Sequence, residues 1–529
     1  MASRAALQVL FSRICQQQGS PYFQVRSDQI HVLKSPIDFY LSLCKGIRTS
    51  YRRILMSSLY VGEGPLERYL ADLLFNKLEV NKHLRITLVN DYHRSCRAGK
   101  LPTFRLLAPL KENFPPNANV TLSYFRPPRV PVGLGSIRTL NEIFGVQHMK
   151  ICVFDDNVLL TGANMSENYF TERQDRCFVV TNCPEFADYC DDLVSMVAEV
   201  GVQWDESGKF SAPMHCPDAR RSNPVAGKRW REWASNRFKM HHFLHQPQSL
   251  PSFDAFYAAA QPQHSAPSPS QSPQELILAA ERGIQWGKKL RTVGRAEDVF
   301  NFIKDLPSEL NIVTGRGGWE EGLTATGNAV YIFPTIQLGS LGLNDDLDLL
   351  KDLLPALQEI TLASGYLNLP SSLTQVLRQM DHLKVICASP SANGFLGDGV
   401  KNWIPYLYRV LEERLLKQLP KAQFYEYEKE GWTFHAKGLW SSLNNSPYLT
   451  AIGSSNYGTM YAARRSYMRD LEFQAYFWSE CGQFSEHLER EIAGIQASCG
   501  PVSSHTLKQS AFKCGPASRL LASALARFL

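Results

Sequence analysis

His148 and Lys150 stand two residues apart at the start of an apolar stretch, and the carboxylate Asp155 follows them. Residues 151–160 are mostly apolar on either side of a polar turn at Asp155, which predicts a β-hairpin. Residues two positions apart in a strand leave the same face, so the imidazole and the ammonium are expected side by side. A histidine can bond covalently to phosphorus while a lysine stabilises the oxygens on which negative charge gathers. The spacing H-x-K-x4-D therefore favours attack on a phosphate.

A second copy of the pair lies at His435 and Lys437. Gly162-Ala163-Asn164 follows the first pair, and Gly453-Ser454-Ser455-Asn456 follows the second with one extra residue. A single H-x-K-x4-D pattern arises by chance in roughly a few chains per hundred, and a lone strand histidine is more often a core residue. Two copies with matched glycine-to-asparagine segments favour one active site assembled from two half-sites.

Paired H-x-K half-sites of this kind resemble those of the phospholipase D superfamily. The resemblance implies an α/β chain of two homologous lobes, each a mixed β-sheet flanked by helices, with the active site at the lobe interface. Four stretches are similar to one branch, the phosphatidylglycerophosphate synthase family of mitochondria: residues 57–67, 162–170 with 173–176, 388–395 and 431–440. They cover both lobes and leave out the segment between them.

The resemblance to that branch implies transfer of a phosphatidyl group from CDP-diacylglycerol to glycerol 3-phosphate. The products are phosphatidylglycerophosphate, for phosphatidylglycerol and cardiolipin synthesis, and CMP. His148 is expected to form a phosphatidyl-histidine, while His435 protonates the leaving CMP and then deprotonates the acceptor hydroxyl. Asp155 completes the first motif as a catalytic residue. Lys150 and Lys437 are expected to hold the non-bridging phosphate oxygens, and Asn164 and Asn456 to add neutral hydrogen-bond donors.

The second half-site departs from the superfamily pattern, because Ser442 stands where the spacing places an aspartate. Both histidines and both lysines are retained, so the difference indicates asymmetric lobes. It favours His148 as the nucleophile, with the opposite assignment left open. Asp175 and Glu472, each downstream of its lobe's glycine-to-asparagine segment, are candidates to orient the histidines. The alternative is that both are ordinary surface carboxylates.

A second group of candidates could bind a substrate phosphate. Gly62 and Gly64 stand between a predicted strand and a predicted helix, where backbone N–H groups can hold a phosphate. An ordinary tight turn explains the same glycines. Ser58 belongs to the same stretch, and Tyr60 and Tyr366 lie at the ends of equivalent strands. The two tyrosines line the cleft or are core aromatics.

The elements that must position these residues occur twice in the same order, which indicates an internal repeat. The first lobe is expected over residues 28–200 and the second over 331–529. Strands are predicted at 53–60, 84–89 and 120–124 and again at 359–366, 382–387 and 422–427, with closing helices at 186–197 and 484–492. Residues 201–330 form a connector whose Pro/Ser/Gln-rich part, 258–275, cannot bury a core and is expected to be a flexible loop.

The two ends of the chain suggest contact with a membrane. Residues 1–27 carry three arginines and no acid, with an apolar helical face, which is typical of a mitochondrial targeting segment. A disordered basic N-terminus is the alternative. The short amphipathic stretch 518–529 is expected to dock on the protein or on anionic lipid. Together with the family resemblance, these features predict peripheral attachment to the matrix side of the mitochondrial inner membrane.

The composition excludes several other classes of protein. The net charge of +6 is spread out, so no nucleic-acid partner is expected. His241, His242 and His245 have no accompanying carboxylate or cysteine, so no metal site is predicted. The chemistry should need no cofactor, although divalent cations could stimulate it at anionic lipid. The rival functions are a phosphodiesterase acting on phospholipid or nucleic-acid ends and a lipid-binding scaffold without activity.

Overall fold

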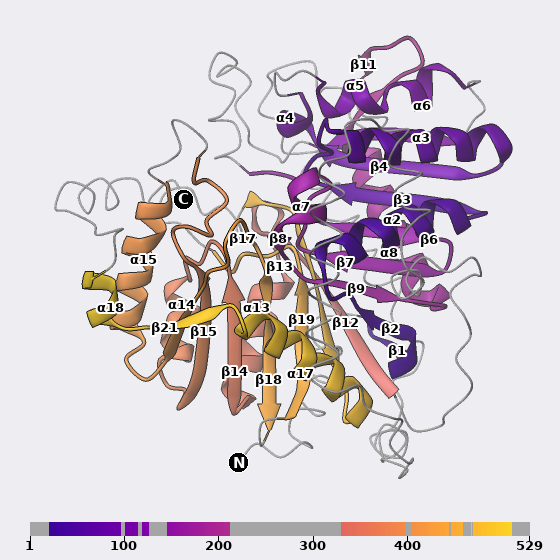
Figure 1. Ribbon diagram of the computed structural model, residues 1–529. Helices are drawn as coiled ribbons and strands as arrows, with labels where there is room; N and C mark the ends of the chain where they lie inside the picture. The colour runs from indigo at the N-terminus through magenta and orange to yellow at the C-terminus, as the bar shows by residue number, and fades with distance from the viewer. Residues whose placement is uncertain are drawn as a thin grey trace.

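The computed structural model describes residues 21–96, 101–114, 119–125, 145–211, 329–397, 404–443, 446–458, 467 and 469–509. Within these residues the chain forms two α/β lobes, each built on a large mixed sheet, and the lobes lie against each other (Figure 1). The predicted fold class is therefore confirmed.

The first lobe is built on a nine-stranded sheet, counted over the described residues, in the order β11-β10-β5-β4-β3-β6-β7-β9-β2. The three parallel strands are β3 (Arg53–Ser58), β4 (Arg85–Asp91) and β5 (Val120–Phe125). The antiparallel strands are β2 (Ile30–Val32), β6 (Ile151–Phe154), β7 (Asn157–Thr161), β9 (Cys177–Val180), β10 (Val202–Trp204) and β11 (Phe210–Ser211).

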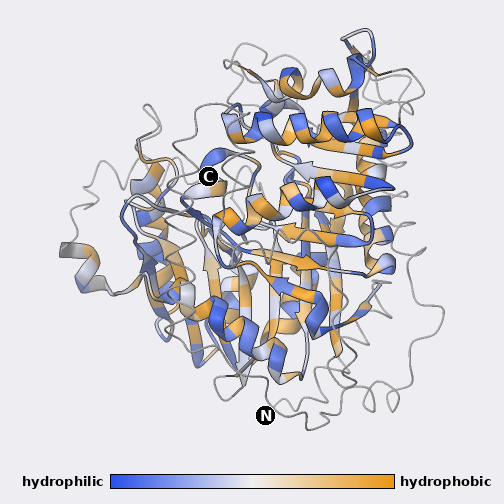
Figure 2. Ribbon diagram, turned by 45° about the vertical axis from the view of Figure 1, so that its right-hand side comes forward, coloured by the Kyte–Doolittle hydropathy of each residue, from blue (hydrophilic) through white to orange (hydrophobic). Residues whose placement is uncertain are grey.

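Helices cover both faces of this sheet, which explains why its strands read as continuous apolar runs. Leu55 of β3 packs in the core on the side of α8 (Pro184–Val200). Its neighbours Ile54 and Met56 pack in a second core under α2 (Pro36–Thr49) and α3 (Pro65–Val80). Figure 2 shows the same division, with apolar strands between helices that carry polar residues on their outer faces. Short helices complete the lobe: α4 (Tyr92–Ser95), α5 (Thr103–Leu107), α6 (Pro109–Glu112) and α7 (Glu167–Thr171).

The second lobe repeats this plan on a ten-stranded sheet of described residues, in the order β1-β12-β20-β19-β18-β14-β15-β16-β21, with β13 paired to β12. Its strands are β1 (Phe23–Arg26), β12 (Ala329–Leu338), β13 (Leu343–Asn344), β14 (Glu359–Ser364), β15 (His382–Ala388), β16 (Gln423–Tyr427), β18 (Lys437–Leu443), β19 (Ser446–Gly453), β20 (Glu472–Trp478) and β21 (Cys499–Val502). Its helices are α13 (Asp345–Leu353), α14 (Ser371–Leu377), α15 (Ile404–Gln418), α17 (Gly482–Gln496) and α18 (Ser504–Gln509).

The predicted repeat of elements is confirmed. The parallel strands β3, β4 and β5 and the hairpin β6–β7 correspond to β14, β15 and β16 and the hairpin β18–β19. Helices α8 and α17 close the two lobes, as expected from their apolar spacing. Among the described helices, none combines the length and the apolar composition needed to cross a membrane.

The structure places some chain segments differently from the predicted boundaries. Residues 23–26, inside the predicted targeting segment, form β1, which pairs with β12 of the second lobe. A removable segment would therefore have to end before Phe23. Residues 202–211 form β10 and β11 of the first sheet, so the first lobe continues past residue 200. These short strands have too few apolar residues to be recognised by periodicity alone.

Several predictions fall on parts of the chain outside the described residues. They concern the targeting segment up to residue 20, the connector from 212 to 328 with its loop at 258–275, the histidines at 241, 242 and 245, and the C-terminal stretch 518–529.

Candidate active site

Two short parallel bridges join the lobes and set the position of each histidine. Gln147 of the first lobe pairs with Leu471 of the second, and the N–H of His148 donates to the Leu471 carbonyl at 2.9 Å. The second bridge pairs β17 (Thr433–Phe434) with β8 (Arg173–Gln174), which Figure 1 shows between the lobes. There the N–H of His435 donates to the Gln174 carbonyl at 2.8 Å. The residue after each bridge is a histidine on one chain segment and a carboxylate on the other.

Each histidine is consequently oriented by the acid of the opposite lobe. His148 Nδ1 lies 2.9 Å from Glu472 Oε2, and His435 Nδ1 lies 2.6 Å from Asp175 Oδ2. All four side chains are buried. The sequence offered both acids as candidates to orient the histidines but did not show which acid faces which histidine. The alternative, that they are surface carboxylates, does not fit their burial.

His148 is held as a neutral imidazole. Burial lowers the pKa of His148 to about 4, although Glu472 acts in the opposite direction. Burial alone would raise the pKa of Glu472, but His148 and Lys150 hold that pKa below its ordinary value. The ionised carboxylate accepts the Nδ1 proton, and this partner assigns the tautomer with a free lone pair on Nε2. None of the residues that the structure describes hydrogen-bonds that nitrogen, so it is available to a substrate.

His435 differs, because a tyrosine covers its second nitrogen. Tyr169 Oη lies 3.3 Å from His435 Nε2, and Asn164 Nδ2 donates to the same hydroxyl at 2.9 Å. Burial, Lys437 and Arg173 hold the pKa of His435 well below its usual range. Lys150 and His148 of the first half-site act in the same direction, so the two half-sites share one electrostatic environment.

Each lysine lies next to the histidine two residues before it, and Lys437 Nζ also lies 2.7 Å from His435 Nδ1. Lys150 Nζ donates to the His148 carbonyl and Lys437 Nζ donates to the His435 carbonyl, both at 2.7 Å. Burial lowers the pKa of Lys150 to about 7 and that of Lys437 to about 8. Burying a cation costs free energy, so two buried lysines are expected where an anionic group binds to the site.

The glycines of the two glycine-to-asparagine segments let the lobes approach. A Cβ on Gly162 would lie 2.6 Å from Asp175 Oδ1 and 3.2 Å from the Gly453 carbonyl. Lys437 Cδ would also lie 3.2 Å away. The side-chain oxygens of Asn164 and Asn456 are buried, and neither has a hydrogen-bond partner among the described residues. Glycine at 162 is therefore required by packing between the half-sites.

Asp155 is placed away from the histidines, so its predicted catalytic role does not fit the structure. Its carboxylate accepts the backbone N–H groups of Tyr51 and Arg52 at 2.8 Å and of Arg53 at 2.9 Å. Asp155 thus ties the β6–β7 turn to the start of β3. Asp155 was selected because of its place in the motif, but its carboxylate has a structural role. Consequently Ser442 at the equivalent spacing gives no information about which histidine is the nucleophile.

The predicted phosphate cradle at Gly62 and Gly64 is not supported, and the tight-turn alternative fits. The N–H of Gly62 already donates to the Met165 carbonyl at 2.8 Å. A Cβ on either glycine would collide with the carboxylate of Glu67. Glu67 in turn accepts the N–H of Glu167 at 2.6 Å. The glycines therefore allow the loop to close over Glu67.

The two candidate tyrosines have different surroundings. The ring of Tyr366 meets that of His435 edge to face, with centroids 5.6 Å apart. Tyr60 Oη lies 3.3 Å from Ser166 Oγ, and Ser58 donates to the Tyr60 carbonyl at 3.1 Å. Tyr366 lines the site on the His435 side, whereas Ser58 shapes the turn after β3.

Sequence reasoning did not assign roles to Tyr169, Arg173 and Arg176, although all three lie in the stretch 162–176. Arg176 is buried between the lobes, where Nε lies 2.8 Å from Glu491 Oε1. Its guanidinium also lies 3.9 Å from the centroid of the Trp440 ring. The only signal was the unusual density of charged residues next to Asp175.

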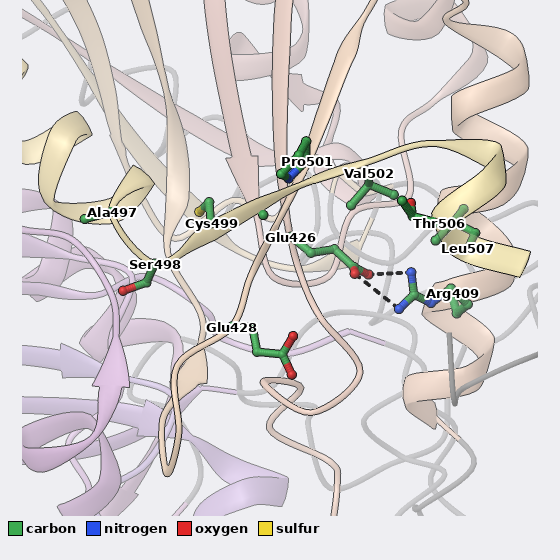
Figure 3. A pocket seen from close by; sticks show the side chains of 11 residues that line it. Arg409, Glu426, Glu428, Ala497, Ser498, Cys499, Pro501, Val502, Thr506 and Leu507 are labelled. Carbon is green, nitrogen blue, oxygen red and sulfur yellow. Dashed lines mark hydrogen bonds and ion pairs between the residues drawn. The ribbon is translucent and has the colours of Figure 1, made fainter. Parts of the chain in front are cut away.

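No metal centre is found in the part of the chain that the structure describes, where no three His, Cys, Asp or Glu side chains are grouped to hold an ion. A cavity of about 390 Å³ lies at the edge of the second sheet. Figure 3 shows that Glu426 faces Arg409 within it, and residues of β21 form one wall. None of the predicted site residues lines this cavity, so it is separate from the histidines.

Comparisons with known proteins agree with the geometry. No protein-family model matches the chain. The mitochondrial CDP-diacylglycerol–glycerol-3-phosphate 3-phosphatidyltransferase of Gallus gallus is 31% identical over 513 residues, which are 92% of this chain and 81% of that protein. The Homo sapiens protein of the same name is 31% identical over 519 residues, with the same coverage. The crystal structure of a Haemophilus influenzae phosphatidylserine synthase superposes with a TM-score of 0.61 and 17% identity, covering 98% of this chain and 97% of that one. That likeness concerns the fold alone.

Proposed function

The chain belongs to the CDP-diacylglycerol–glycerol-3-phosphate 3-phosphatidyltransferase family, and we infer that it moves a phosphatidyl group from CDP-diacylglycerol to glycerol 3-phosphate. The observation that carries this inference is the pair of buried histidines, each bonded to a carboxylate of the opposite lobe. Two lysines in the same site supply positive charge for phosphate oxygens.

In the first half-reaction, His148 Nε2 attacks the phosphorus that carries diacylglycerol. A nitrogen–phosphorus bond forms, and the bond from phosphorus to the CMP oxygen breaks. His435 gives its Nε2 proton to that oxygen. His148 Nε2 has no hydrogen-bond partner among the described residues, and Tyr169 lies over Nε2 of His435; both observations support this division of roles.

The second half-reaction reverses these steps with a new alcohol. His435 takes the proton of a glycerol 3-phosphate hydroxyl, the new oxygen–phosphorus bond forms, and the bond to His148 breaks. His435 must therefore be protonated before the first step and neutral before the second. Burial and the neighbouring cations lower the pKa of His435, and the negative charges of a bound diphosphate would raise that pKa.

No metal ion is assigned to either step. Lys150 and Lys437 each donate to the backbone carbonyl of the histidine two residues before them, and each can neutralise a phosphate oxygen as a protonated amine. Divalent ions could still stimulate the reaction by bridging anionic headgroups.

We also assign the protein to the mitochondrion, with peripheral contact at the matrix side of the inner membrane. The relatives' names carry the word mitochondrial. The substrate CDP-diacylglycerol carries two acyl chains, so the site has to reach a lipid surface.

The activity is tested by incubating the purified full chain with CDP-diacylglycerol and a panel of alcohols and measuring CMP release. Rapid release is expected with glycerol 3-phosphate and slow release with serine or glycerol. His148→Ala and His435→Ala should each abolish it, and the double variant should cost little more because the two act as a unit. Substantial turnover by either single variant contradicts the two-histidine mechanism.

A further inference from the structure

Arg173 is a buried cation of the active site that has no assigned role. Its Nε donates to Thr433 Oγ1 at 2.8 Å, and its guanidinium lies 4.4 Å from the centroid of the Tyr169 ring. Among the described residues, no carboxylate lies within ion-pair distance of the guanidinium. A buried arginine without a counter-ion is costly, which indicates that an anion joins it during function.

The position of Arg173 places that anion beside His435. Arg173 pairs with Thr433 in the bridge between β8 and β17, two residues before His435. Burial is the main cause of the lowered pKa of His435, and the charge of Arg173 acts in the same direction. A Cβ on Gly394 would lie 2.9 Å from both Arg173 Nη2 and Tyr366 Oη. Glycine at 394 thus leaves space where the guanidinium and the phenol converge.

The equivalent position in the other half-site carries the opposite charge. Asp470 precedes Glu472 by two residues, as Arg173 precedes Asp175, and the two parallel bridges align these segments. Asp470 Oδ1 accepts the N–H of Val146 at 2.9 Å. The site therefore has a cation beside His435 and a carboxylate beside His148, although its histidines and lysines are nearly symmetric.

This asymmetry matches the geometry of two successive in-line displacements. If His148 is the nucleophile, CMP leaves and the acceptor enters on the opposite side of the phosphorus, where His435 lies. CMP and glycerol 3-phosphate are both phosphate monoesters, and arginine binds such groups through paired N–H donors.

We propose that Arg173, together with the Tyr366 hydroxyl, binds the phosphate monoester on the His435 side of the site. In the second half-reaction this contact selects a phosphorylated alcohol as the acceptor. The inference rests on the proposed phosphatidyl transfer and adds the residue that recognises the second phosphate.

The test compares Arg173→Gln and Arg173→Lys with the full-length wild type in mixed micelles of CDP-diacylglycerol. Arg48→Gln is the control, because Arg48 also lies over a tyrosine ring, at 5.9 Å from the Tyr69 centroid, but belongs to α2. Loss of a charged hydrogen bond predicts a KM for glycerol 3-phosphate roughly 10- to 100-fold higher in Arg173→Gln. Arg173→Lys should lie in between, Tyr366→Phe should show a smaller rise, and Arg48→Gln should match the wild type.

Two further measurements distinguish lost recognition of the phosphate from other causes of a raised KM, such as loss of folded protein. The preference for glycerol 3-phosphate over glycerol should fall by the same factor in Arg173→Gln, and this ratio does not depend on the fraction of folded protein. Exchange of labelled CMP into CDP-diacylglycerol without acceptor reports on the CMP phosphate. Weakened exchange with an unchanged acceptor KM identifies CMP as the bound monoester. Unchanged KM, preference and exchange would overturn the proposal. A wild type that releases no CMP contradicts the phosphatidyl transfer itself.

Discussion

His148 and Glu472 belong to different lobes, yet His148 Nδ1 lies 2.9 Å from Glu472 Oε2. His435 and Asp175 repeat the relationship in the opposite direction at 2.6 Å. Each half-site therefore lacks one essential group until the other lobe completes it. The two parallel bridges bring each histidine next to the carboxylate of the opposite lobe.

Removal of either carboxylate charge should reduce turnover without removing the nucleophile. In Glu472→Gln and Asp175→Asn the histidine loses the partner that fixes its tautomer, so kcat should fall by roughly 10²- to 10⁴-fold. Glu489→Gln, on the exposed face of α17, is the matched control and should behave as wild type. Steady-state CMP release gives the comparison. Equal activities of Glu472→Gln and Glu489→Gln contradict the orienting role.

Binding of a phosphate ligand should take up protons near neutral pH. Burial lowers the pKa of Lys150 to about 7 and that of Lys437 to about 8, so both are partly neutral at pH 8. An anion raises both values and protonates the amines, with uptake on the order of one proton. Calorimetric titration with CMP in buffers of different ionisation enthalpy measures this number. Lys437→Met should lower it, and proton release by the wild type would contradict the charge assignment.

The same depressed pKa values predict how stability depends on pH. An unfolded lysine titrates near pH 10.4, so the unfolded chain binds more protons than the folded chain between about pH 7 and that value. Stability therefore gains from these lysines as pH rises through this window. Denaturant unfolding of the wild type and of Lys150→Met at pH 7 and pH 9 should show the larger gain in the wild type. An equal gain in both proteins would mean that the pKa of Lys150 is not lowered in the folded chain.

Arg176 should stabilise the interface between the lobes. Its removal takes the ionic partner from the buried Glu491, which keeps the Trp440 Nε1 donor, and breaking a buried ion pair costs about 3–5 kcal/mol. The pair Arg490–Glu486 on α17 is the control, because it lies at the surface and should contribute at most about 1 kcal/mol. Urea unfolding of Arg176→Ala and Arg490→Ala tests the difference. Similar losses in the free energy of unfolding would show that the buried pair stabilises the protein no more than the surface pair does.

The sequence predicted the fold and the paired half-sites because both depend on local signals. Apolar strands, closing helices and the H-x-K spacing can be read within short windows. The pairing of His148 with Glu472 could not, because it depends on a bridge between residues more than three hundred positions apart. Asp155 was misjudged for the same reason, since its partners at residues 51–53 are remote in the chain.

Gly62 illustrates a second limit of sequence reasoning. A glycine between a strand and a helix is compatible with a phosphate cradle or a tight turn, and the choice depends on whether its N–H is free. Here Met165, about a hundred residues away, takes that N–H. Arg173 shows the converse, because its proposed role rests on the absence of a carboxylate within ion-pair distance among the described residues, which the sequence does not show.

Removal of divalent cations should leave the chemical steps intact. Because Lys150 and Lys437 can neutralise the phosphate oxygens, exchange of CMP in neutral detergent micelles should continue in excess EDTA at a rate within about threefold of the untreated enzyme. Stimulation by Mg²⁺ should appear only with anionic lipid. Complete loss of CMP exchange in neutral micelles, restored by a stoichiometric metal, contradicts the hypothesis that the two lysines neutralise the phosphate.

The most direct test of the phosphatidyl-histidine is the configuration of the phosphorus. A donor analogue with a chiral phosphorothioate at the transferred phosphorus is converted to product with glycerol 3-phosphate, and the product configuration is determined. Two in-line displacements, the first by His148, each invert the centre and predict net retention. A single direct attack by the acceptor hydroxyl, with the histidines acting only as acid and base, gives inversion. Retention is the result expected here, and an inverted product would contradict a covalent role for His148.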